Sequence, residues 1–282
     1  MEVITTPADM RAWSDRRKLD GSRLGFVPTM GALHDGHLAL VEEARRHTDR
    51  VIVSIFVNPL QFNVRDDFDR YPRPIDNDLA RCREAGVDAV YAPTAAAMYP
   101  DAFQTYVEPG PLAERLEGAH RPGHFRGVTT VVAKLFAATR PHLAVFGQKD
   151  AQQLAIIERM VHDLDLGIEI VALPTVREPD GLAMSSRNRR LGPEDRRAAT
   201  CLWHGLDAAR REASVGTTDV DELLRLATAP IVAQPRARLE YLELVDAATF
   251  MPVDEIGHDR RSLLVVAAWF GDVRLIDNLP LS

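Results

Sequence analysis

Two histidines three positions apart, His34 and His37, lie in a segment whose residue types suit phosphate chemistry. The segment PTMGALHDGH follows a short apolar run, 24–27, that predicts a buried strand, and apolar residues recur at helical spacing after it. The histidines therefore fall where a strand turns into a helix. The start of that helix favours an anion, and Gly31 and Gly36 allow the backbone to approach it closely. The imidazoles can then donate to phosphoryl oxygens that gain charge during a displacement.

The elements around this turn predict an α/β fold with a parallel sheet. The run RVIVSIFV at 50–57 is rich in β-branched residues and does not alternate, which is typical of a strand buried on both faces. Other elements are expected as strands at 2–5, 89–92, 143–146 and 168–173, helices at 75–85 and 128–139, a polar loop at 61–74, and a smaller α+β unit with strands at 239–245 and 263–270. Ligands of doubly wound sheets bind beyond the carboxyl ends of the strands, where the two histidines, Asn58 and Gln61 fall.

Two further segments carry side chains that suit an oligophosphate. Lys149 and Gln153, four apart, share a face of the helix expected after the strand at 143–146, where the lysine can clamp phosphate charge. The run MSSRNRR at 184–190 places two hydroxyls beside three arginines. Each segment taken alone is more often a solvated loop, and an isolated H-x-x-H more often marks two surface histidines. The combination therefore carries the interpretation.

Composition limits the classes of protein to which the chain can belong. Its 282 residues, 46% hydrophobic and 27% charged, predict one large or two modest globular domains. A formal charge of -7 and a pI near 5.7 argue against a nucleic-acid partner. No apolar run approaches the ~20 residues that span a bilayer, and the N-terminus lacks the plan of a signal peptide. We therefore expect a cytoplasmic chain with no membrane partner.

Neither the two cysteines nor the pair His120 and His124 predicts a metal site. Cys82 and Cys201 lie far apart in helix-like segments, so both are expected to be reduced core residues. His120 and His124 are four apart, but the Pro-Gly pair between them prevents a helical ligand pair.

Five segments together resemble the pantothenate synthetases, also called pantoate–β-alanine ligases. They are PTMGALHDGH (28–37), FVNPLQF (56–62), HFRGV (124–128), GQKDAQQ (147–153) and GLAMSSRN (181–188). The resemblance implies a Rossmann-type doubly wound parallel sheet of the HIGH-type nucleotidylyltransferases, similar to class I aminoacyl-tRNA synthetases. It further implies an ATP- and pantoate-binding domain at 1–175, a smaller α+β lid domain at 176–282, and a homodimer.

The reaction implied by this resemblance is a ligation that forms AMP. Pantoate and β-alanine are condensed to pantothenate (vitamin B5), a precursor of coenzyme A, with release of AMP and pyrophosphate by way of a pantoyl adenylate. Because the pantoate carboxylate itself attacks the α-phosphorus, no protein nucleophile is needed, and catalysis is positioning and charge stabilisation. ATP is then a substrate, and Mg²⁺ is expected with it, held mostly by phosphate oxygens and waters.

The resemblance also assigns residues to each substrate. The catalytic residues are His37, His34 and Lys149, with His37 as the proton donor. The ATP-binding residues are Met30, Gly31, Ala32, Leu33, His34, Asp35, Gly36, His37, Gly147, Gln148, Lys149, Asp150, Val176, Met184, Ser185, Ser186 and Arg187. Gln61 and Gln153 bind pantoate, and Gln61 also lies near β-alanine. The chain departs from the family pattern at Ala151 and in the loop 63–68, and Arg126 adds a charge near the pocket.

Two other functions remain open from the sequence. The first is a nucleotidylyltransferase that transfers AMP to a phosphate ester and stops there, which needs a cationic acceptor pocket in place of paired glutamines. The second is a catalytically silent nucleotide-binding protein, against which the retained histidines, Lys149 and the Ser-Ser-Arg group argue. Consumption of the amine separates the ligase from the first alternative, and any turnover excludes the second.

Overall fold

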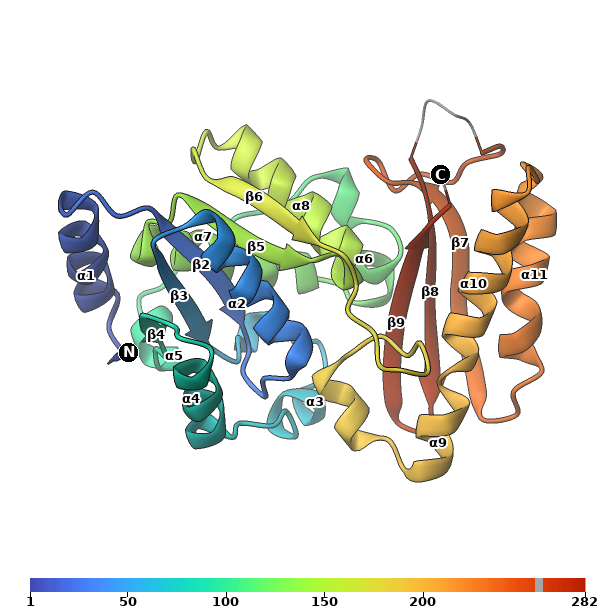
Figure 1. Ribbon diagram of the computed structural model, residues 1–282, viewed down its shortest axis with the longest axis horizontal. Coiled ribbons are helices and arrows are strands. Elements are labelled where there is room, and N and C mark those ends of the chain that lie inside the picture. Colours follow the sequence, from blue (N-terminus) through green and yellow to red (C-terminus); the bar gives the residue numbers. More distant parts are fainter. Residues whose placement is uncertain (257–260, 282) are drawn as a thin grey trace. The chain divides into compact units, whose positions relative to one another are not determined.

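Buried strands alternate with amphipathic helices along the first part of the chain and build a six-stranded sheet (Figure 1). In the computed structural model, which describes residues 1–256 and 261–281, the strands are β1 (Glu2–Ile4), β2 (Leu24–Thr29), β3 (Arg50–Ile55), β4 (Ala89–Tyr91), β5 (Leu143–Gly147) and β6 (Glu169–Leu173). They are parallel and lie in the order β1-β4-β3-β2-β5-β6. The chain runs outward from β2 to β4 and then returns on the other side of β2. The strand order therefore reverses between β2 and β5, which is where ligands of such sheets bind.

Helices cover both faces of this sheet, as a doubly wound fold requires. They are α1 (Pro7–Leu19), α2 (Asp35–His47), α4 (Ile75–Glu84), α7 (His124–Thr139) and α8 (Ala151–Asp163). One apolar cluster joins Val27 and Val53 of the sheet to α2 and α4, and a second joins Phe26 and Ile52 to α1, α7 and α8. Adjacent strand residues thus point into two different cores. The fold class predicted from the sequence is confirmed.

Short helical turns fill the connections, and the structure corrects two of the sequence-based expectations. They are η1 (Pro59–Gln61), α3 (Arg65–Asp69), α5 (Ala95–Met98), η2 (Pro111–Ala113), α6 (Glu117–His120) and η3 (Gln148–Asp150). The expected loop at 61–74 contains the helix α3, and α7 begins at His124 instead of Val128. His120 ends α6 and His124 begins α7, so the two histidines lie on different helices, as predicted.

A smaller antiparallel sheet forms the second part of the fold. It contains β7 (Ala237–Asp246), β8 (Ser262–Phe270) and β9 (Val273–Pro280), preceded by η4 (Ser186–Arg190), α9 (Pro193–Ala198), α10 (Cys201–Ser214) and α11 (Val220–Val232). Leu206 of α10 and Leu223 of α11 pack with Leu264 and Val266 of β8 in one apolar cluster. This is the predicted α+β unit, although β9 was not expected.

The chain divides into two compact units that do not follow a single cut in the sequence. The first contains Met1–Gln148 and Gln152–Pro174, and the second contains Lys149–Ala151 and Thr175–Ser282. Cys82 and Cys201 are both buried and unbonded, as expected. None of the helices in the described part of the chain has the length and apolar character needed to cross a bilayer.

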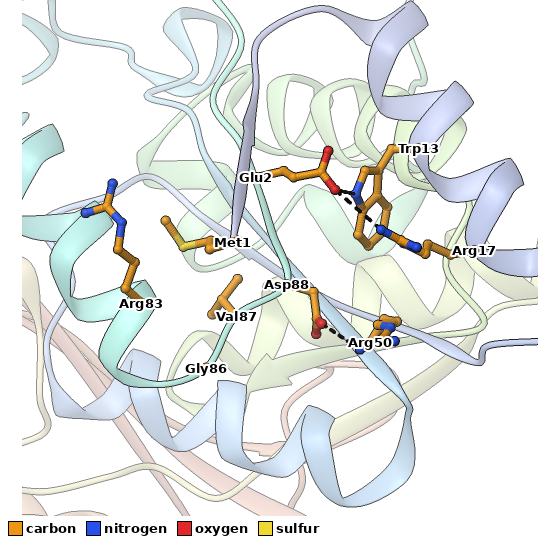
Figure 2. A pocket seen from close by; sticks show the side chains of 9 residues that line it. All are labelled: Met1, Glu2, Trp13, Arg17, Arg50, Arg83, Gly86, Val87 and Asp88. Atoms are coloured by element: carbon orange, nitrogen blue, oxygen red, sulfur yellow. Dashed lines mark hydrogen bonds and ion pairs between the residues drawn. The ribbon is translucent and has the colours of Figure 1, made fainter. Parts of the chain in front are cut away.

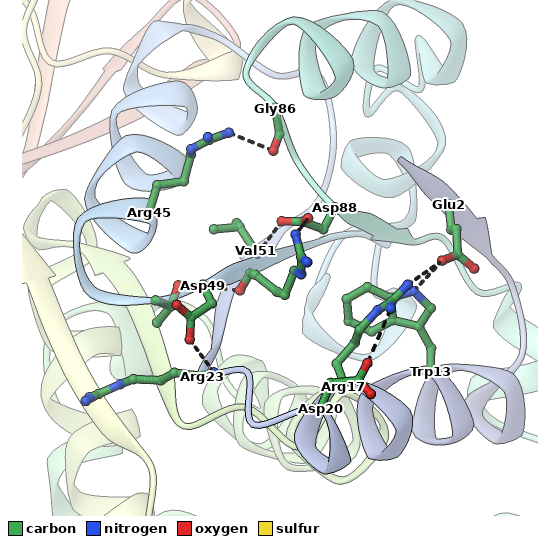
Figure 3. A network of polar contacts seen from close by, with 12 residues as sticks. Glu2, Trp13, Arg17, Asp20, Arg23, Arg45, Asp49, Val51, Gly86 and Asp88 are labelled. Atoms are coloured by element: carbon green, nitrogen blue, oxygen red, sulfur yellow. Dashed lines mark hydrogen bonds and ion pairs between the residues drawn. The ribbon is translucent and has the colours of Figure 1, made fainter.

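Polar contacts fix the amino-terminal edge of the parallel sheet, where the strands begin (Figure 3). The Asp88 carboxylate accepts from the Val51 N–H at 2.9 Å and from Arg50 at 3.1 Å. On the same edge, the Arg23 N–H donates to Asp49 at 2.8 Å. These bonds tie the loops that precede β2, β3 and β4. The candidate site lies at the opposite edge, at the carboxyl ends of the same strands.

Candidate active site

The turn that carries the two histidines follows the carboxyl end of β2. Gly31 has a φ of +82°, a backbone conformation that favours glycine. An added Cβ there would lie 2.9 Å from the Asp78 carboxylate and 3.0 Å from Ile55. The Gly31 N–H donates to Thr29 Oγ1 at 3.1 Å, and that hydroxyl donates to the Ser54 carbonyl at 2.7 Å. The end of β3 therefore braces the start of the turn.

Helix α4 holds the rest of the turn with two side chains that the sequence analysis missed. The two carboxylate oxygens of Asp78 accept from the N–H groups of Ala32 and Leu33, each at 2.8 Å, and Asp78 is only 1% exposed. Arg81 donates to the Leu33 carbonyl at 2.8 Å and pairs with Asp35. Asp78 and Arg81 lie three positions apart and so share one face of α4. This spacing is the feature of the sequence from which their joint role could have been inferred.

These contacts decide which backbone groups of the turn remain for a ligand. The N–H groups of Ala32 and Leu33 point at Asp78, so they are used inside the protein. The first N–H groups of α2, at Asp35 and Gly36, have no intrahelical acceptor because they begin the helix. The anion-binding capacity expected at this turn therefore comes from the start of α2 and from the imidazoles.

The two imidazoles lie side by side at the start of α2. Their ring centroids are 4.0 Å apart, with the planes inclined at 39°. The His34 N–H donates to His37 Nδ1 at 3.2 Å, so Nδ1 is an acceptor and the proton of the neutral ring lies on Nε2. The N–H donor of the neutral His37 ring is therefore on Nε2.

Gln61 is the predicted pantoate residue that the structure brings to the histidine turn. It ends η1, after β3, and its Nε2 contacts Met30 Sδ at 3.2 Å. Gly147 ends β5 and Gln148 follows it, so both lie at the same edge of the sheet, because β5 pairs in parallel with β2. Gln153 lies on α8, and its side chain makes no hydrogen bond in the part of the chain that the structure describes. Its approach to Gln61 is still a prediction.

Lys149 and Asp150 belong to the second unit together with the predicted phosphate flap at 184–187. The Lys149 carbonyl accepts from Asn278 Nδ2 at 2.8 Å, so β9 holds the backbone of the lysine in place. Asp277 on the same strand is buried and makes a two-point ion pair with Arg177, at 2.6 and 2.9 Å. Burial raises the pKa of Asp277, and the Arg177 guanidinium opposes that rise.

The segment that carries the hydroxyls and arginines is a folded turn. The Met184 N–H donates to the Val176 carbonyl at 2.9 Å, and Ser185 caps η4 by accepting from the Arg187 N–H at 3.2 Å. Ser186 is 7% exposed, and Arg187 is half-buried. The histidines lie in the first unit and this segment in the second. Whether they act on one substrate therefore remains a prediction.

A cavity of about 460 Å³ opens at the amino-terminal edge of the parallel sheet, as Figure 2 shows. Arg50, which begins β3, and Asp88, which precedes β4, both line it. Arg17 and Arg50 are engaged there by Glu2 and Asp88, at 3.5 and 3.1 Å. Ligands of open α/β sheets bind at the opposite, carboxyl edge. The cavity is therefore not part of the candidate site.

The carboxylates near the histidine turn do not form a metal centre. Both carboxylate oxygens of Asp78 accept hydrogen bonds from backbone N–H groups, and Asp35 forms an ion pair with Arg81. Among residues 1–256 and 261–281, no group of three or more His, Cys, Asp or Glu side chains could hold a metal ion.

The chain matches known proteins over almost its whole length. A family model described as pantoate-beta-alanine ligase matches residues 2–280. A pantothenate synthetase from Chlorobaculum tepidum is 49% identical over 278 residues, which cover 99% of this chain and 98% of that protein. Pantothenate synthetase 1 from Bradyrhizobium diazoefficiens is 53% identical over 283 residues, which cover 100% of this chain and 99% of the relative.

Solved structures give the same result. The pantothenate synthetase of Thermus thermophilus superposes with a TM-score of 0.94 at 48% identity, covering 100% of this chain and 99% of that one. A pantoate-beta-alanine ligase from Francisella tularensis, complexed with beta-gamma ATP and beta-alanine, has a TM-score of 0.82 at 33% identity and covers 100% and 98%. Because the family model and these relatives span nearly all of the chain, the protein belongs to the pantoate-β-alanine ligase family.

Proposed function

We propose that this protein condenses pantoate with β-alanine at the expense of ATP, by way of a pantoyl adenylate, in pantothenate and coenzyme A biosynthesis. The observation that carries the proposal is the match to the ligase family over residues 2–280. The ATP and β-alanine named with the Francisella tularensis relative support both as substrates here. The chemistry has two steps, and each breaks one bond at a phosphoryl or acyl centre.

In the first step, a pantoate carboxylate oxygen attacks the α-phosphorus of ATP and pyrophosphate leaves. In the second, the β-alanine amine attacks the acyl carbon, and AMP leaves as the amide forms and the amine loses a proton. Neither step needs a protein nucleophile, so the protein contributes by orienting the reactants and stabilising charge.

His37 and His34 act on the charge that develops in the first step. The proton of the neutral His37 ring lies on Nε2, since Nδ1 accepts from the His34 N–H. An N–H donor at this position stabilises oxygens that become more negative as pyrophosphate leaves. The first turn of α2 adds N–H groups with no intrahelical acceptor.

ATP binds across residues 30–37 and 147–150. The backbone of Val176 contacts the adenine base, and residues 184–187 close over the phosphates. Lys149 supplies a positive charge for the phosphates, and its carbonyl bond to Asn278 supports that role. The Ser185 cap on η4 gives Arg187 a defined backbone from which to reach a phosphate. In this proposal, residues 1–175 bind ATP and pantoate, and residues 176–282 act as the lid.

Pantoate is held by the carboxamides of Gln61 and Gln153, and Gln61 also lies near the incoming β-alanine. An amide can donate to a carboxylate and accept from a hydroxyl, which suits a small hydroxy acid. The contact between Gln61 and Met30 supports a place for Gln61 beside the histidine turn.

Mg²⁺ accompanies ATP as part of the nucleotide substrate, and we assign it no protein ligand. We also propose that the enzyme is a cytoplasmic homodimer. Two buried cysteines without a disulfide, and ATP as substrate, support the location. The family resemblance supports the dimer, which light scattering of the purified protein measures.

The test is pyrophosphate exchange into ATP, followed by an assay of amide formation. We expect exchange that depends on pantoate alone, and release of AMP at the steady state only when β-alanine is also present. Exchange without pantoate, or AMP transfer that leaves β-alanine unconsumed, would refute the ligase and point to a simple nucleotidylyltransferase.

A further inference from the structure

The orientation of the Gln61 carboxamide is set by a buried chain of hydrogen bonds that starts at Asn58. Asn58 follows β3, caps η1 and is 1% exposed. Its Oδ1 accepts from the Leu60 N–H at 3.3 Å, and its Nδ2 donates to the Gly127 carbonyl at 3.0 Å. A backbone N–H can only donate and a carbonyl can only accept. Two backbone groups therefore fix which end of the Asn58 amide is oxygen and which is nitrogen.

The second Asn58 N–H then fixes Gln61. It donates to Gln61 Oε1 at 3.0 Å, so the oxygen of Gln61 is used inside the protein. Gln61 Nε2 faces the other way, toward the Met30 sulfur. A thioether is a weak acceptor, so the amino group can give up this contact to an oxygen of a ligand at little cost.

Tyr99 completes the chain. Its hydroxyl donates to Asn58 Oδ1 at 2.8 Å, so all four hydrogen-bonding positions of the Asn58 amide are filled. The ring packs against Phe56 and Phe103, with centroids 6.2 and 5.0 Å away. Burial raises the pKa of Tyr99, which keeps the hydroxyl protonated and able to donate.

The backbone of Gln61 is held from the other side by α7 and the turn before it. Arg121 donates to His124 Nε2 at 3.2 Å, and since a guanidinium only donates, the His124 proton lies on Nδ1. That Nδ1 donates to the Gln61 carbonyl at 2.8 Å. A Cβ on Gly127 would lie 2.3 Å from the Leu60 carbonyl oxygen, so only glycine lets α7 approach this closely. The HFRGV motif thus contributes to the orientation of Gln61.

We propose that Tyr99 and Asn58 are positioning residues that turn the Gln61 carboxamide so that its amino group faces the bound acid. This rests on the proposed function, in which Gln61 binds pantoate. It adds that Gln61 acts there as a donor to a pantoate oxygen, because Asn58 holds the Gln61 oxygen on its own side and leaves the amino group on the side of Met30 and the histidine turn.

A double-mutant cycle on the full-length enzyme tests this proposal, with Tyr99→Phe and Gln61→Ala made singly and together. We expect Tyr99→Phe to lower kcat/KM for pantoate roughly three- to tenfold, the factor that one buried hydrogen bond corresponds to, and to leave the KM for ATP unchanged. In the Gln61→Ala background the same change should alter kcat/KM by less than about twofold, because Tyr99 then has no side chain to act through. A purely structural role would instead lower kcat/KM by the same factor in both backgrounds.

Tyr106→Phe is the matched control. Tyr106 belongs to the same row of rings, 5.2 Å from Phe103, but makes no hydrogen bond through its hydroxyl in the described part of the chain. This variant should match the unaltered enzyme for both substrates.

Each outcome gives a decision. If Gln61→Ala weakens pantoate use but the two changes are additive, Tyr99 does not act through Gln61, and the positioning proposal falls while the pantoate assignment stands. If Gln61→Ala leaves kcat/KM for pantoate unchanged, the assignment of Gln61 to pantoate falls and the positioning proposal falls with it. Non-additive loss confined to pantoate supports the proposal.

Discussion

Replacing Asp78 by alanine should both destabilise the protein and disable the histidine turn. The two carboxylate oxygens of Asp78 accept from buried N–H groups of Ala32 and Leu33, each at 2.8 Å. Hydrogen bonds to a charged group contribute about 1.5–3 kcal/mol each, so losing both should lower the free energy of unfolding by about 3–6 kcal/mol. Ala32 has a φ of +50°, and the Asp78 bonds help to hold it in that left-handed conformation.

Asp78→Asn is the graded variant. It keeps the shape of the side chain and one acceptor, but its amino group then faces one of the two N–H donors. The expected loss is about 1–3 kcal/mol, the cost of one unsatisfied buried donor. Asp76→Ala, on an exposed position of the same helix, removes only a charge at a helix N-terminus and should cost under about 1 kcal/mol.

Urea unfolding followed by far-UV circular dichroism measures these differences, and single-turnover adenylate formation measures the effect on the site. We expect the rate of adenylate formation in Asp78→Asn to fall while the chain stays folded, because the turn that carries the imidazoles has lost one of its supports. The reasoning is refuted if Asp78→Ala unfolds within about 1 kcal/mol of Asp76→Ala and forms the adenylate at the unaltered rate.

Three further predictions address the chemistry, the pH dependence and the second unit. His37→Ala should slow adenylate formation by roughly 10² or more with a smaller change in ATP affinity, measured by single-turnover kinetics, because a transition-state donor is lost. Burial, with nearby positive charges, lowers the pKa of His142, whose Nδ1 accepts from the Leu24 N–H at 2.9 Å. As the pH falls below about 6.5, the His142 imidazole therefore becomes protonated in the unfolded chain before it does in the folded one, so acidification lowers the stability of the fold. An asparagine at this position can still accept the Leu24 N–H bond but does not titrate, so thermal melts of His142→Asn should show a smaller loss of stability on acidification. Arg177→Met should cost about 3–5 kcal/mol in chemical denaturation by leaving the Asp277 carboxylate buried without its partner, and adding Asp277→Leu should restore much of that loss.

The parallel sheet could be predicted because each of its main strands is apolar over a continuous stretch. In β3, Val51 and Val53 face one core and Ile52 the other, so the sequence shows no alternation, and this absence is itself the signature of a strand covered on both sides. The place of the histidines at the end of β2 followed from the same reasoning, because a helical pattern begins directly after the strand.

Strand β9 could not be predicted because a charge lies on its inner face. Val273 and Leu275 point inward in alternation, but the next inward residue is Asp277, which interrupts the apolar pattern. Its burial depends on Arg177, which is 100 residues away along the chain. No local pattern contains that information.

The support of the histidine turn was missed for a similar reason. The acceptor for the Ala32 N–H is Asp78, 46 residues further along the chain. On α4 the pair Asp78 and Arg81 looks like an ordinary solvated ion pair, and only the packing of α4 against the turn shows that each side chain serves the backbone. The orientation of Gln61 was hidden in the same way, since it depends on Gly127 and Tyr99.

The short piece Lys149–Ala151 belongs to the second unit although both of its flanks belong to the first. A gene fragment that stopped at residue 174 would encode every strand of the large sheet and Lys149 itself, yet it would lack Asn278, whose side chain secures the lysine carbonyl. Recombination between relatives at this apparent boundary would likewise join a lysine from one parent to a supporting strand from the other. In this enzyme, a fragment or recombinant that contains Lys149 therefore does not necessarily contain the residue that supports it.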